Sequence, residues 1–585
     1  MTKEKWLVLW VFILLLAACG GGAQPEKPAQ SSPAAEKPAE STPAAEKPAE
    51  APATEASTQS QAAGGGTVRI GWAGAPDTLN PGTAILFEAY VIFDLVYDQM
   101  FDLTLDGGLT PGLAESWETS DDGKTWTFKI KQGVKFHDGK PMTAKDVAFT
   151  YNFYRSHEDF PFMQSYGQTF ESVEATDDST VVIKLGEAIP TMEANLYPQY
   201  ILPEHIWGKL EGKAATEFEN LEMVGTGAFQ MVEYKQNEFV RLKANPDYYG
   251  GAPKVDEIVF QTFGNPDAMV QALVTGQVDM INDMPATAVP TLRNNKDVTV
   301  VIGQPNAPEV RDIFFNQVTP ENCPKDDGGK CTGHPALLDR NVRLALAHAT
   351  DKQNIIDVAM LGLASPGRTL VPDGMGDWYN SSLEDYAFDI AKANQILDEA
   401  GYKDSDSDGV REMPDGSKPL DFRLYWPNNV VEAPRMADLL ADSWKQIGVK
   451  LQPQVLDPDA LTNVCCPAFD YDIIIWGWSF SVDPDYPLTI YRTSDIATGN
   501  NESGYSNPKF DELYEQQLHE LDREKRRQIV WEAQKLIFDD VVYVIPFYQQ
   551  KVQAFRNDRF KGWITDQPKV LLEDPTSLTV IEPVQ

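Results

Sequence analysis

The sequence predicts an α/β protein with more than one folded unit. Residues 473–475 form a β-branched run that is too short for a helix and is typical of a strand buried on both faces. Apolar residues recur at helical spacing in 84–100 and 522–538. With 585 residues the chain is too long for a single hydrophobic core, so we expect two or three subdomains.

The charge of the chain excludes one class of partner. The formal net charge is −38 at pH 7. Nucleic acid is therefore a poor partner, since binding it requires a basic face. The acidity favours solubility and neutral or cationic ligands.

Residues 1–19 have the features of an export signal. Two lysines precede an uncharged apolar run at 6–18, which is too short to span a bilayer comfortably. The run ends in Leu-Ala-Ala-Cys19-Gly, which resembles the bacterial lipobox, so we expect a lipid on Cys19. A secretory signal with a chance cysteine is the alternative. Residues 20–66 lack large apolar side chains and are rich in Pro, Ala and Glu, which predicts a disordered tether.

Local patterns predict individual elements of the folded body. Residues 68–72 are expected to form the first strand, and apolar side chains alternate in 126–130 behind an Asp-Asp-Gly turn. Thr143 is expected to cap a helix, and Asn507 followed by proline predicts another helix start. Residues 541–547 are expected to form a strand that returns to the sheet.

Four cysteines remain after the export signal. In an exported protein they suggest disulfides, with three possible connectivities. Cys323 and Cys331 flank a polar turn that can bring them together, so we favour this pair. A bridge between Cys465 and Cys466 would be vicinal, which is uncommon, and the sequence leaves it open. Metal binding is a weaker alternative because the spacing that structural zinc prefers is absent.

Aromatic and acidic residues follow the run at 473–475. They are Trp476, Trp478, Asp483 and Asp485. The carboxyl end of a buried strand is where open α/β sheets hold ligands, so we expect these side chains to line a binding site. An ordinary strand followed by a turn is the alternative.

Two other tryptophans are candidates for the same site. Trp72 ends the first predicted strand, and Trp426 follows a later one. Each is equally well explained as a core residue.

An acidic loop has the pattern of a twelve-residue calcium site. Carboxylates at positions 1, 3, 5, 9 and 12 and glycine at position 6 allow alternate oxygens to converge on one hard cation. The candidate ligands are Asp404, Asp406, Asp408, Val410 through its carbonyl, Glu412 and Asp415. A strand rather than a helix is expected after the loop. The alternative is an acidic turn closed by aspartate side chains, so calcium is expected only as a structural ion, and no cofactor is required.

Four segments share motifs with one known family. Residues 113–154 carry two hairpin turns and the capped helix, and VGTGAF at 224–229 is similar to a GTGPF element with Ala228 at the proline position. DRNVRLALAHATD at 339–351 is similar to a VRxALxxAID helix, and YSNPKFDEL at 505–513 also matches. By these motifs the chain resembles the family 5 extracellular solute-binding proteins, the dipeptide-, oligopeptide- and nickel-type binding components of ATP-driven importers.

The resemblance implies a fold and a function. The fold is a two-lobed α/β arrangement of the periplasmic-binding-protein type II kind, with an extra subdomain and a ligand cleft between the lobes. We expect the first lobe at 67–304 plus 541–585, its subdomain at about 98–225, and the second lobe at 305–540. The implied function is capture of peptides and their delivery to a membrane permease. The resemblance also implies that the protein is a monomer. Its expected location is the outer face of the cell membrane, held by the lipid anchor, or the periplasm.

One departure from the family leaves the ligand open. In the peptide-binding members, an aspartate shortly before a conserved Asp-Pro pairs with the amino terminus of the peptide. Here residues 478–482, before Asp483-Pro484, contain no acid, and Asp483 itself is the candidate substitute. An aromatic-lined pocket suits an oligosaccharide as well, and a metal chelate is a further alternative.

Enzymatic alternatives have little support in the sequence. The six histidines are scattered, and no HExxH, GxSxG or P-loop motif is present. A secreted hydrolase using Asp483 and Asp485 as a carboxylate pair is a weak alternative. A surface sensor or adhesin without a transporter is another.

Overall fold

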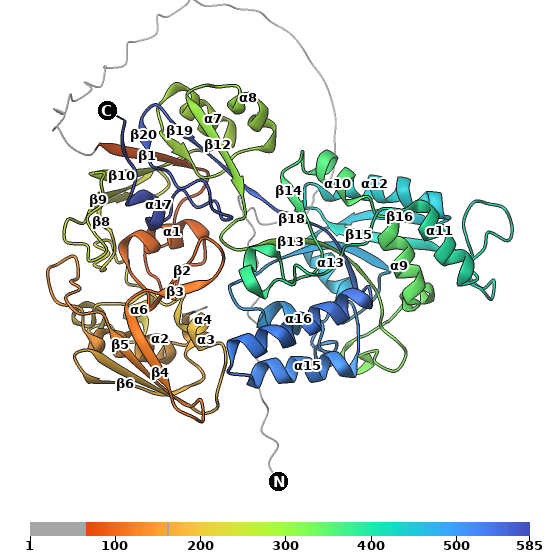
Figure 1. The fold of residues 1–585 in the computed structure, drawn as a ribbon, viewed down its shortest axis with the longest axis horizontal. Coiled ribbons are helices and arrows are strands. Elements are labelled where there is room, and N and C mark those ends of the chain that lie inside the picture. Colours follow the sequence, from red (N-terminus) through yellow and green to blue (C-terminus); the bar gives the residue numbers. More distant parts are fainter. Residues whose placement is uncertain (1–65, 161–162, 585) are drawn as a thin grey trace, which may run out of the picture. The chain divides into compact units, whose positions relative to one another are not determined.

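The structure, a computed structural model, describes residues 66–160 and 163–584 (Figure 1). The predicted export signal, Cys19 and the tether up to residue 65 lie outside this part. Within the described ranges, no helix has the length and apolar character needed to cross a membrane.

The first large sheet has seven strands in the order β12-β19-β11-β1-β10-β9-β8. Strand β1 runs parallel to β10 and β11, and the other neighbours are antiparallel. The bounds are β1 Thr67–Trp72, β8 Phe229–Lys235, β9 Phe239–Ala244, β10 Glu257–Thr262, β11 Met280–Ile281, β12 Val298–Gly303 and β19 Lys551–Arg556.

Helices and the C-terminal segment cover this sheet. Apolar side chains of β1 and β10 pack with α1, while β11, β12 and β19 pack with α7 and α8. The bounds are α1 Phe87–Val96, α7 Pro266–Thr275, α8 Val289–Arg293, α17 Pro575–Leu578, β20 Phe560–Lys561 and β21 Glu582–Pro583.

A four-stranded antiparallel sheet in the order β4-β5-β7-β6 forms a separate core with α2. Its strands lie within the range 98–225 that was expected to form a subdomain. The bounds are β2 Phe101–Leu103, β3 Leu109–Pro111, β4 Ala114–Thr119, β5 Thr125–Ile130, β6 Phe170–Asp177, β7 Thr180–Leu185, α2 Ala144–Ser156, α3 Met163–Tyr166, α4 Met192–Leu196, α5 Glu204–Trp207 and α6 Lys213–Thr216.

The second large sheet has six strands in the order β14-β18-β13-β17-β15-β16. Strand β17 is antiparallel to β13 and parallel to β15, so this sheet is mixed. The bounds are β13 Glu309–Phe315, β14 Ala364–Pro366, β15 Asp421–Pro427, β16 Lys450–Leu456, β17 Ile473–Ser479 and β18 Tyr543–Gln549.

Helices cover both faces of the second sheet. One face packs against apolar side chains of α9 to α12, and the other packs against α13 to α16. The bounds are α9 Arg340–His348, α10 Lys352–Ala359, α11 Ile390–Glu399, α12 Ala433–Trp444, α13 Pro458–Cys465, α14 Asp485–Thr489, α15 Pro508–His519 and α16 Arg523–Asp539.

Helix starts follow the capping signals in the sequence. Thr143 accepts a hydrogen bond from the second helical amide, and the Asp146 side chain accepts one from the Thr143 amide, which completes a capping box. The Asn507 side chain accepts from the Lys509 amide, with proline at the first position of α15. These two predicted helix starts are confirmed.

Two short segments connect the sheets and divide the chain into two lobes (Figure 1). The first segment lies between β12 and β13, and the second is Gln550, between β18 and β19. Because β18 pairs with β13 and β14, residues 541–549 belong to the second lobe. The predicted boundary before residue 541 was wrong: the strand was expected, but sequence alone does not show which sheet it joins.

Polar contacts hold the first connecting segment to the C-terminal part of the chain. The Gln304 amide donates to the Pro568 carbonyl at 2.8 Å, and Lys569 Nζ donates to the Asn306 carbonyl at 2.8 Å. Burial lowers the pKa of Lys569 to about 8. The segment after β19 therefore packs against the point at which the chain leaves the first lobe.

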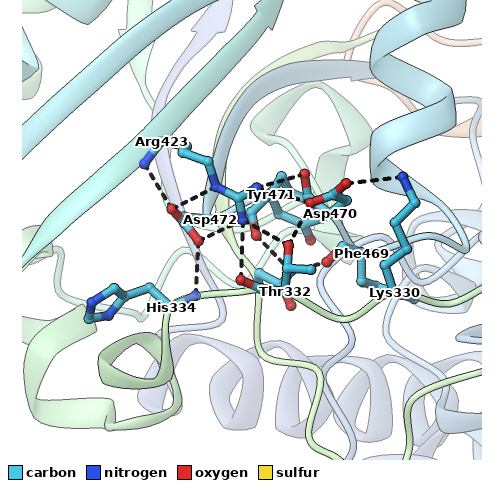
Figure 2. Close-up of polar contacts among 9 residues, drawn as sticks. Lys330, Thr332, His334, Arg423, Phe469, Asp470, Tyr471 and Asp472 are labelled. Carbon is cyan, nitrogen blue, oxygen red and sulfur yellow. Dashed lines mark hydrogen bonds and ion pairs between the residues drawn. The ribbon is translucent and has the colours of Figure 1, made fainter. Parts of the chain in front are cut away.

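A polar network fixes the start of β17 at the end of the sheet away from the connections (Figure 2). Arg423 of β15 donates from Nε to Asp472 Oδ2 at 3.1 Å and from Nη1 to Asp470 Oδ1 at 3.0 Å. Asp472 also accepts from the amides of Arg423 and His334, at 2.8 and 2.9 Å. Thr332 donates to Asp470 at 2.6 Å. The network ties the loop at 330–334 to two strands.

Replacing Asp472 with alanine should destabilise the second lobe. The change removes one of the two carboxylate partners of the Arg423 guanidinium and leaves two backbone amides without their acceptor, for an expected loss of about 3 kcal/mol in the free energy of unfolding. Urea unfolding followed by tryptophan fluorescence measures it. Asp438→Ala, at an exposed position of α12, is the control and should change stability by less than about 0.5 kcal/mol. Equal losses in both variants would contradict this role of the network.

Candidate ligand-binding site

Strand β17 includes both of the tryptophans that follow 473–475 in the sequence. It runs to Ser479, so Trp476 and Trp478 are strand residues rather than loop residues. Their direct partners on β13 are Asp312 and Val310. Opposed residues of an antiparallel pair project to the same face of the sheet. We call this side the aromatic face; its β13 and β17 residues are Val310, Asp312, Phe314, Ile474, Trp476 and Trp478.

The two tryptophans are the accessible part of the aromatic face. Both are partly exposed, whereas the other strand residues of this face are buried. The rings of Trp478 and Phe480 are stacked with centroids 6.3 Å apart. Tyr486 approaches Trp478 edge-on at 6.1 Å. This end of β17 therefore presents a broad aromatic surface, the kind of wall that ligand pockets use.

Glu502 is held beneath these rings by hydrogen bonds. Its Oε1 accepts from Trp478 Nε1 at 3.0 Å and from the Tyr543 hydroxyl at 3.1 Å. Its carbonyl accepts from the Tyr471 hydroxyl. The ring of Tyr491 lies edge-on to Tyr543 with centroids 5.3 Å apart. Glu502 is only 4% exposed, so its side chain has a defined position inside the aromatic layer.

Asp312 is a second buried carboxyl group on the same face. It is 0% exposed, and neither of its side-chain oxygens has a hydrogen-bond partner among the described residues. Burial raises the pKa of Asp312 to about 7, and the charge of Arg311 opposes part of this rise. Burial also raises the pKa of Glu502, and the negative charge of Asp312 raises it further. Such a pair retains protons near neutral pH unless a cation approaches.

Sequence reasoning missed Asp312 and Glu502. The sequence offered only a weak signal for Asp312, which directly precedes the apolar residues Ile313, Phe314 and Phe315 but follows the charged Arg311 in the same strand. No comparable signal marks Glu502, which lies in a polar stretch.

The opposite face of β13 carries a cation that is already neutralised. Arg311 Nη2 lies 2.7 Å from Glu432 Oε1, and Arg311 Nη1 donates to the Trp476 carbonyl at 3.0 Å. Arg311 and Asp312 are consecutive in the strand and therefore project to opposite faces. The positive charge thus lies behind the sheet, away from the aromatic face.

Asp483 and Asp485, which were predicted to contact ligand, are engaged within the protein. Asp483 forms a two-fold ion pair with Arg526, at 2.6 and 2.7 Å. Asp485 Oδ1 accepts from Tyr514 and Gln517, each at 2.8 Å, and burial raises its pKa. Both carboxyl groups fasten α14 to α15 and α16. The structure therefore does not support Asp483 as a free substitute for the missing acid.

Trp72 and Trp426 are core residues of different lobes. Trp72 is 0% exposed, packs on Phe260 and donates to Thr262 Oγ1 at 3.2 Å. Trp426 packs in the core beneath α9 to α12, on the face of the sheet opposite the aromatic face. The structure does not bring either ring to Trp476 and Trp478, so the core alternative holds for both.

The acidic loop brings together four of its five predicted carboxylate ligands. Oxygens of Asp404, Asp406, Asp408 and Glu412 lie within 4.8 Å of one another. Asp415 is not part of this group and accepts instead from the Ser417 amide at 2.9 Å. Asp404 also closes the turn by accepting from the amides of Asp408 and Gly409, at 3.1 and 3.0 Å. Calcium binding, with Val410 contributing its carbonyl, therefore stays a prediction.

Two disulfides are present in the described part of the chain. One joins Cys323 to Cys331, the pair favoured from the sequence, and the other joins the neighbours Cys465 and Cys466. The amides of Lys330 and Cys331 donate to the Ala468 carbonyl at 2.7 and 3.0 Å. The two bridged segments therefore lie side by side, next to the network around Arg423.

Comparisons with known proteins identify relatives along most of the chain. The family model of bacterial extracellular solute-binding proteins, family 5 Middle, matches residues 108–499. The oligopeptide-binding protein AppA of Bacillus subtilis is 28% identical over 557 residues, which cover 94% of this chain and 93% of that protein. Heme-binding protein A of Haemophilus influenzae is 27% identical over 537 residues, which cover 87% and 92%.

Solved structures give the same picture. The ABC transporter substrate binding protein CtaP of Listeria monocytogenes has a TM-score of 0.74 at 29% identity, covering 89% of this chain and all of that one. AppA of Bacillus subtilis, in complex with a nonapeptide, has a TM-score of 0.62 at 26% identity, covering 89% and 99%.

The Asp312→Asn variant should remove one component of the dependence of stability on pH. The folded protein retains the Asp312 proton up to about pH 7, whereas the unfolded chain loses it near pH 4. The wild type therefore loses stability, relative to the variant, as the pH rises from about 4 to 7, on the order of 3 kcal/mol.

Urea unfolding of both proteins between pH 4 and 8 measures this difference. The charged and titrating groups around Asp312 are Arg311, Glu502, Tyr491 and Tyr543, and all remain in the variant. A difference that stays constant with pH would contradict the buried carboxyl assignment.

If the acidic loop binds calcium, the ion should stabilise the second lobe. Millimolar CaCl2 is then expected to raise Tm relative to EDTA, because a cation relieves the repulsion of crowded carboxylates. The double variant Asp404→Asn, Asp408→Asn should lose this response and keep its Tm in EDTA. An equal rise in wild type and variant would contradict a site at this loop.

Proposed function

The chain belongs to family 5 of the bacterial extracellular solute-binding proteins, and on this premise we propose that it captures di- or oligopeptides and delivers them to a membrane permease. Members of this family are solute-binding components of ABC importers for peptides or related ligands, and they are not enzymes. The proposal specifies peptides as the solutes that this protein binds.

One observation carries the peptide assignment. The chain matches an oligopeptide-binding protein over 94% of its length, and the solved structure of that protein holds a nonapeptide. The aromatic surface of Trp476 and Trp478 supports the proposal, because side chains of this kind bury apolar parts of a ligand while their polar edges take hydrogen bonds.

A heme or another metal chelate is the second candidate. Heme-binding protein A covers this chain almost as completely and at nearly the same identity, and flat macrocycles also stack on aromatic rings. None of the β13 and β17 residues that form the aromatic face is a histidine, which argues against capture of a bare transition-metal ion. An oligosaccharide is the weaker candidate, because only the aromatic rings support it.

We place the protein at the outer face of the cell membrane as part of the same proposal. The lipobox-like sequence at Cys19 supports a lipid anchor. A monomer is expected for delivery of one solute at a time to a permease.

The test is a ligand panel on the full chain. Thermal unfolding and tryptophan fluorescence would be recorded with peptides of two to nine residues, with maltotriose and with heme. A peptide at about one hundred times its Kd should stabilise the folded protein by about 2.7 kcal/mol, because it binds only the folded state.

The three ligand classes give different outcomes. A rise of Tm with peptides, accompanied by a change in tryptophan emission, supports the proposal. A response to heme alone would transfer the assignment to the chelate candidate, and a response to maltotriose alone would transfer it to sugars. Trp478→Phe is the matched variant, because it removes the hydrogen bond to Glu502 while keeping an aromatic ring.

A further inference from the structure

Two turns of the subdomain in the first lobe touch the second lobe. They are the β2–β3 turn and the β4–β5 turn. We propose that the α15–α16 turn of the second lobe is a latch that holds the β4–β5 turn, and that the contact at the β2–β3 turn is the pivot about which the lobes separate. The inference goes beyond the proposed function, because it concerns the resting state of the lobes without any solute.

The pivot is a contact between two pieces of glycine backbone. A β-carbon on Gly107 would collide with the Gly374 carbonyl oxygen, and one on Gly376 would lie 2.9 Å from the Asp106 carbonyl oxygen. Gly107 and Gly376 also have φ of 89° and 62°, which other residues rarely adopt. Because glycines bring no side chains that interlock, one surface can turn on the other at this point.

The pivot lies next to the first connecting segment between the lobes. A β-carbon on Gly374 would lie 2.7 Å from Pro308 Cγ. Lys569 Nζ donates to the Asn306 carbonyl at 2.8 Å, and the Lys569 amide donates to the Leu105 carbonyl of the β2–β3 turn at 3.1 Å. The turn and the connecting segment are therefore held together, so rotation here moves remote parts of the lobes and leaves the connection in place.

The latch contact is apolar and lies away from the pivot. A β-carbon on Gly123, in the β4–β5 turn, would collide with a methyl group of Leu521, in the α15–α16 turn. Leu521 is 42% exposed, so the contact covers only part of its side chain. Strand β4 separates the two turns of the subdomain, and its six residues extend for about 20 Å. So small a contact can break and form again while both lobes stay folded.

Opposite charges support the latch. Burial raises the pKa of Glu193, in α4 of the subdomain, and the positive charge of Arg523 opposes part of this rise. Arg523 is the first residue of α16 and binds Asp377 of its own lobe at 2.6 and 2.8 Å. The guanidinium group is thus fixed on the second lobe, and its charge attracts Glu193 of the first lobe.

The latch is attached to the candidate site by rigid contacts. The guanidinium groups of Arg523 and Arg526 lie over the ring of Trp378, 4.7 and 5.0 Å from its centroid. Arg526 also binds Asp483, which follows β17, through two hydrogen bonds. The α15–α16 turn and the end of β17 therefore belong to one rigid unit, and a latched subdomain is fixed relative to the aromatic face.

Single-molecule energy transfer on the full chain tests whether the lobes stay together without solute. Azide-bearing residues at the exposed positions Glu174 of β6 and Gln516 of α15 would carry the two dyes. We expect most wild-type molecules to show high transfer. Leu521→Asp should raise the low-transfer population about tenfold, because it removes an apolar contact and places a charge beside the β4–β5 turn, which already contains Asp121 and Asp122.

Leu338→Asp is the matched control for the latch. Leu338 belongs to the second lobe and is also 42% exposed, so the same change there should leave the transfer distribution as in the wild type. An unchanged distribution in Leu521→Asp, or an equal change in both variants, would overturn the latch. A wild type that shows low transfer alone would overturn it as well.

Gly107→Ala tests the pivot. The added β-carbon collides with the Gly374 carbonyl oxygen, so we expect fewer molecules with high transfer. Gly139→Ala is the matched control, because Gly139 has a φ of 85° and its β-carbon would have no atom within 4 Å. Equal distributions in the two variants would overturn the pivot.

Hydrogen exchange of Leu521→Asp tests the pivot even if Gly107→Ala does not fold. With the latch released, residues 104–108 and 373–378 should keep the protection of the wild type, whereas residues 121–124 should lose part of theirs. Loss of protection at 104–108 together with 121–124 would mean that the whole subdomain detaches, which would overturn the pivot.

Discussion

The antiparallel pairing of β13 with β17 is the interaction on which the candidate site depends. Its register places Asp312 opposite Trp476 and Val310 opposite Trp478. A shift of one residue would turn Asp312 to the other face and bring Arg311 to the aromatic rings, because side chains alternate along a strand. The network around Arg423 holds β17 in place at the far end of this pairing.

The pairing also explains why positive and negative side chains of β13 lie on opposite faces of the second sheet. Arg311 with Glu432 lies on one face, and Asp312 with Glu502 lies on the other. Burying an ionised carboxyl group without a partner costs several kcal/mol, and the protein avoids part of this cost by retaining protons. Negative charge on the aromatic face is therefore conditional on pH and on what is bound there.

Local features of the fold follow from the sequence, whereas long-range ones do not. The helix starts at Thr143 and Asn507 depend on contacts within three residues, and the sequence motifs by themselves are enough to indicate the family. The partner of Asp483 is different: Arg526 lies forty-three positions away, and no local pattern connects the two. Likewise, no local pattern shows that β18 joins the second sheet, because its place depends on the order of the strands in that sheet.

The dependence on long-range packing also explains which of the predicted site residues the structure brings together. A tryptophan next to a strand signals either a pocket or a core, and only packing distinguishes Trp72, which is enclosed, from Trp478, which is partly exposed. The buried carboxyl group of Asp312 could not be singled out in the sequence, because Glu309 and Arg311 of the same strand are also charged and only the fold shows which side chain is enclosed.

The strand order also constrains how the chain reaches its folded state. β19 lies between β11 and β12 in the seven-stranded sheet, yet it follows the entire second lobe in the sequence. Strand β12 cannot join the first sheet, and β14 cannot join the second, until the last tenth of the chain is available, because their partners β19 and β18 are separated by Gln550 alone. A chain that is delivered from its N-terminus therefore leaves both lobes incomplete until these two strands have been made.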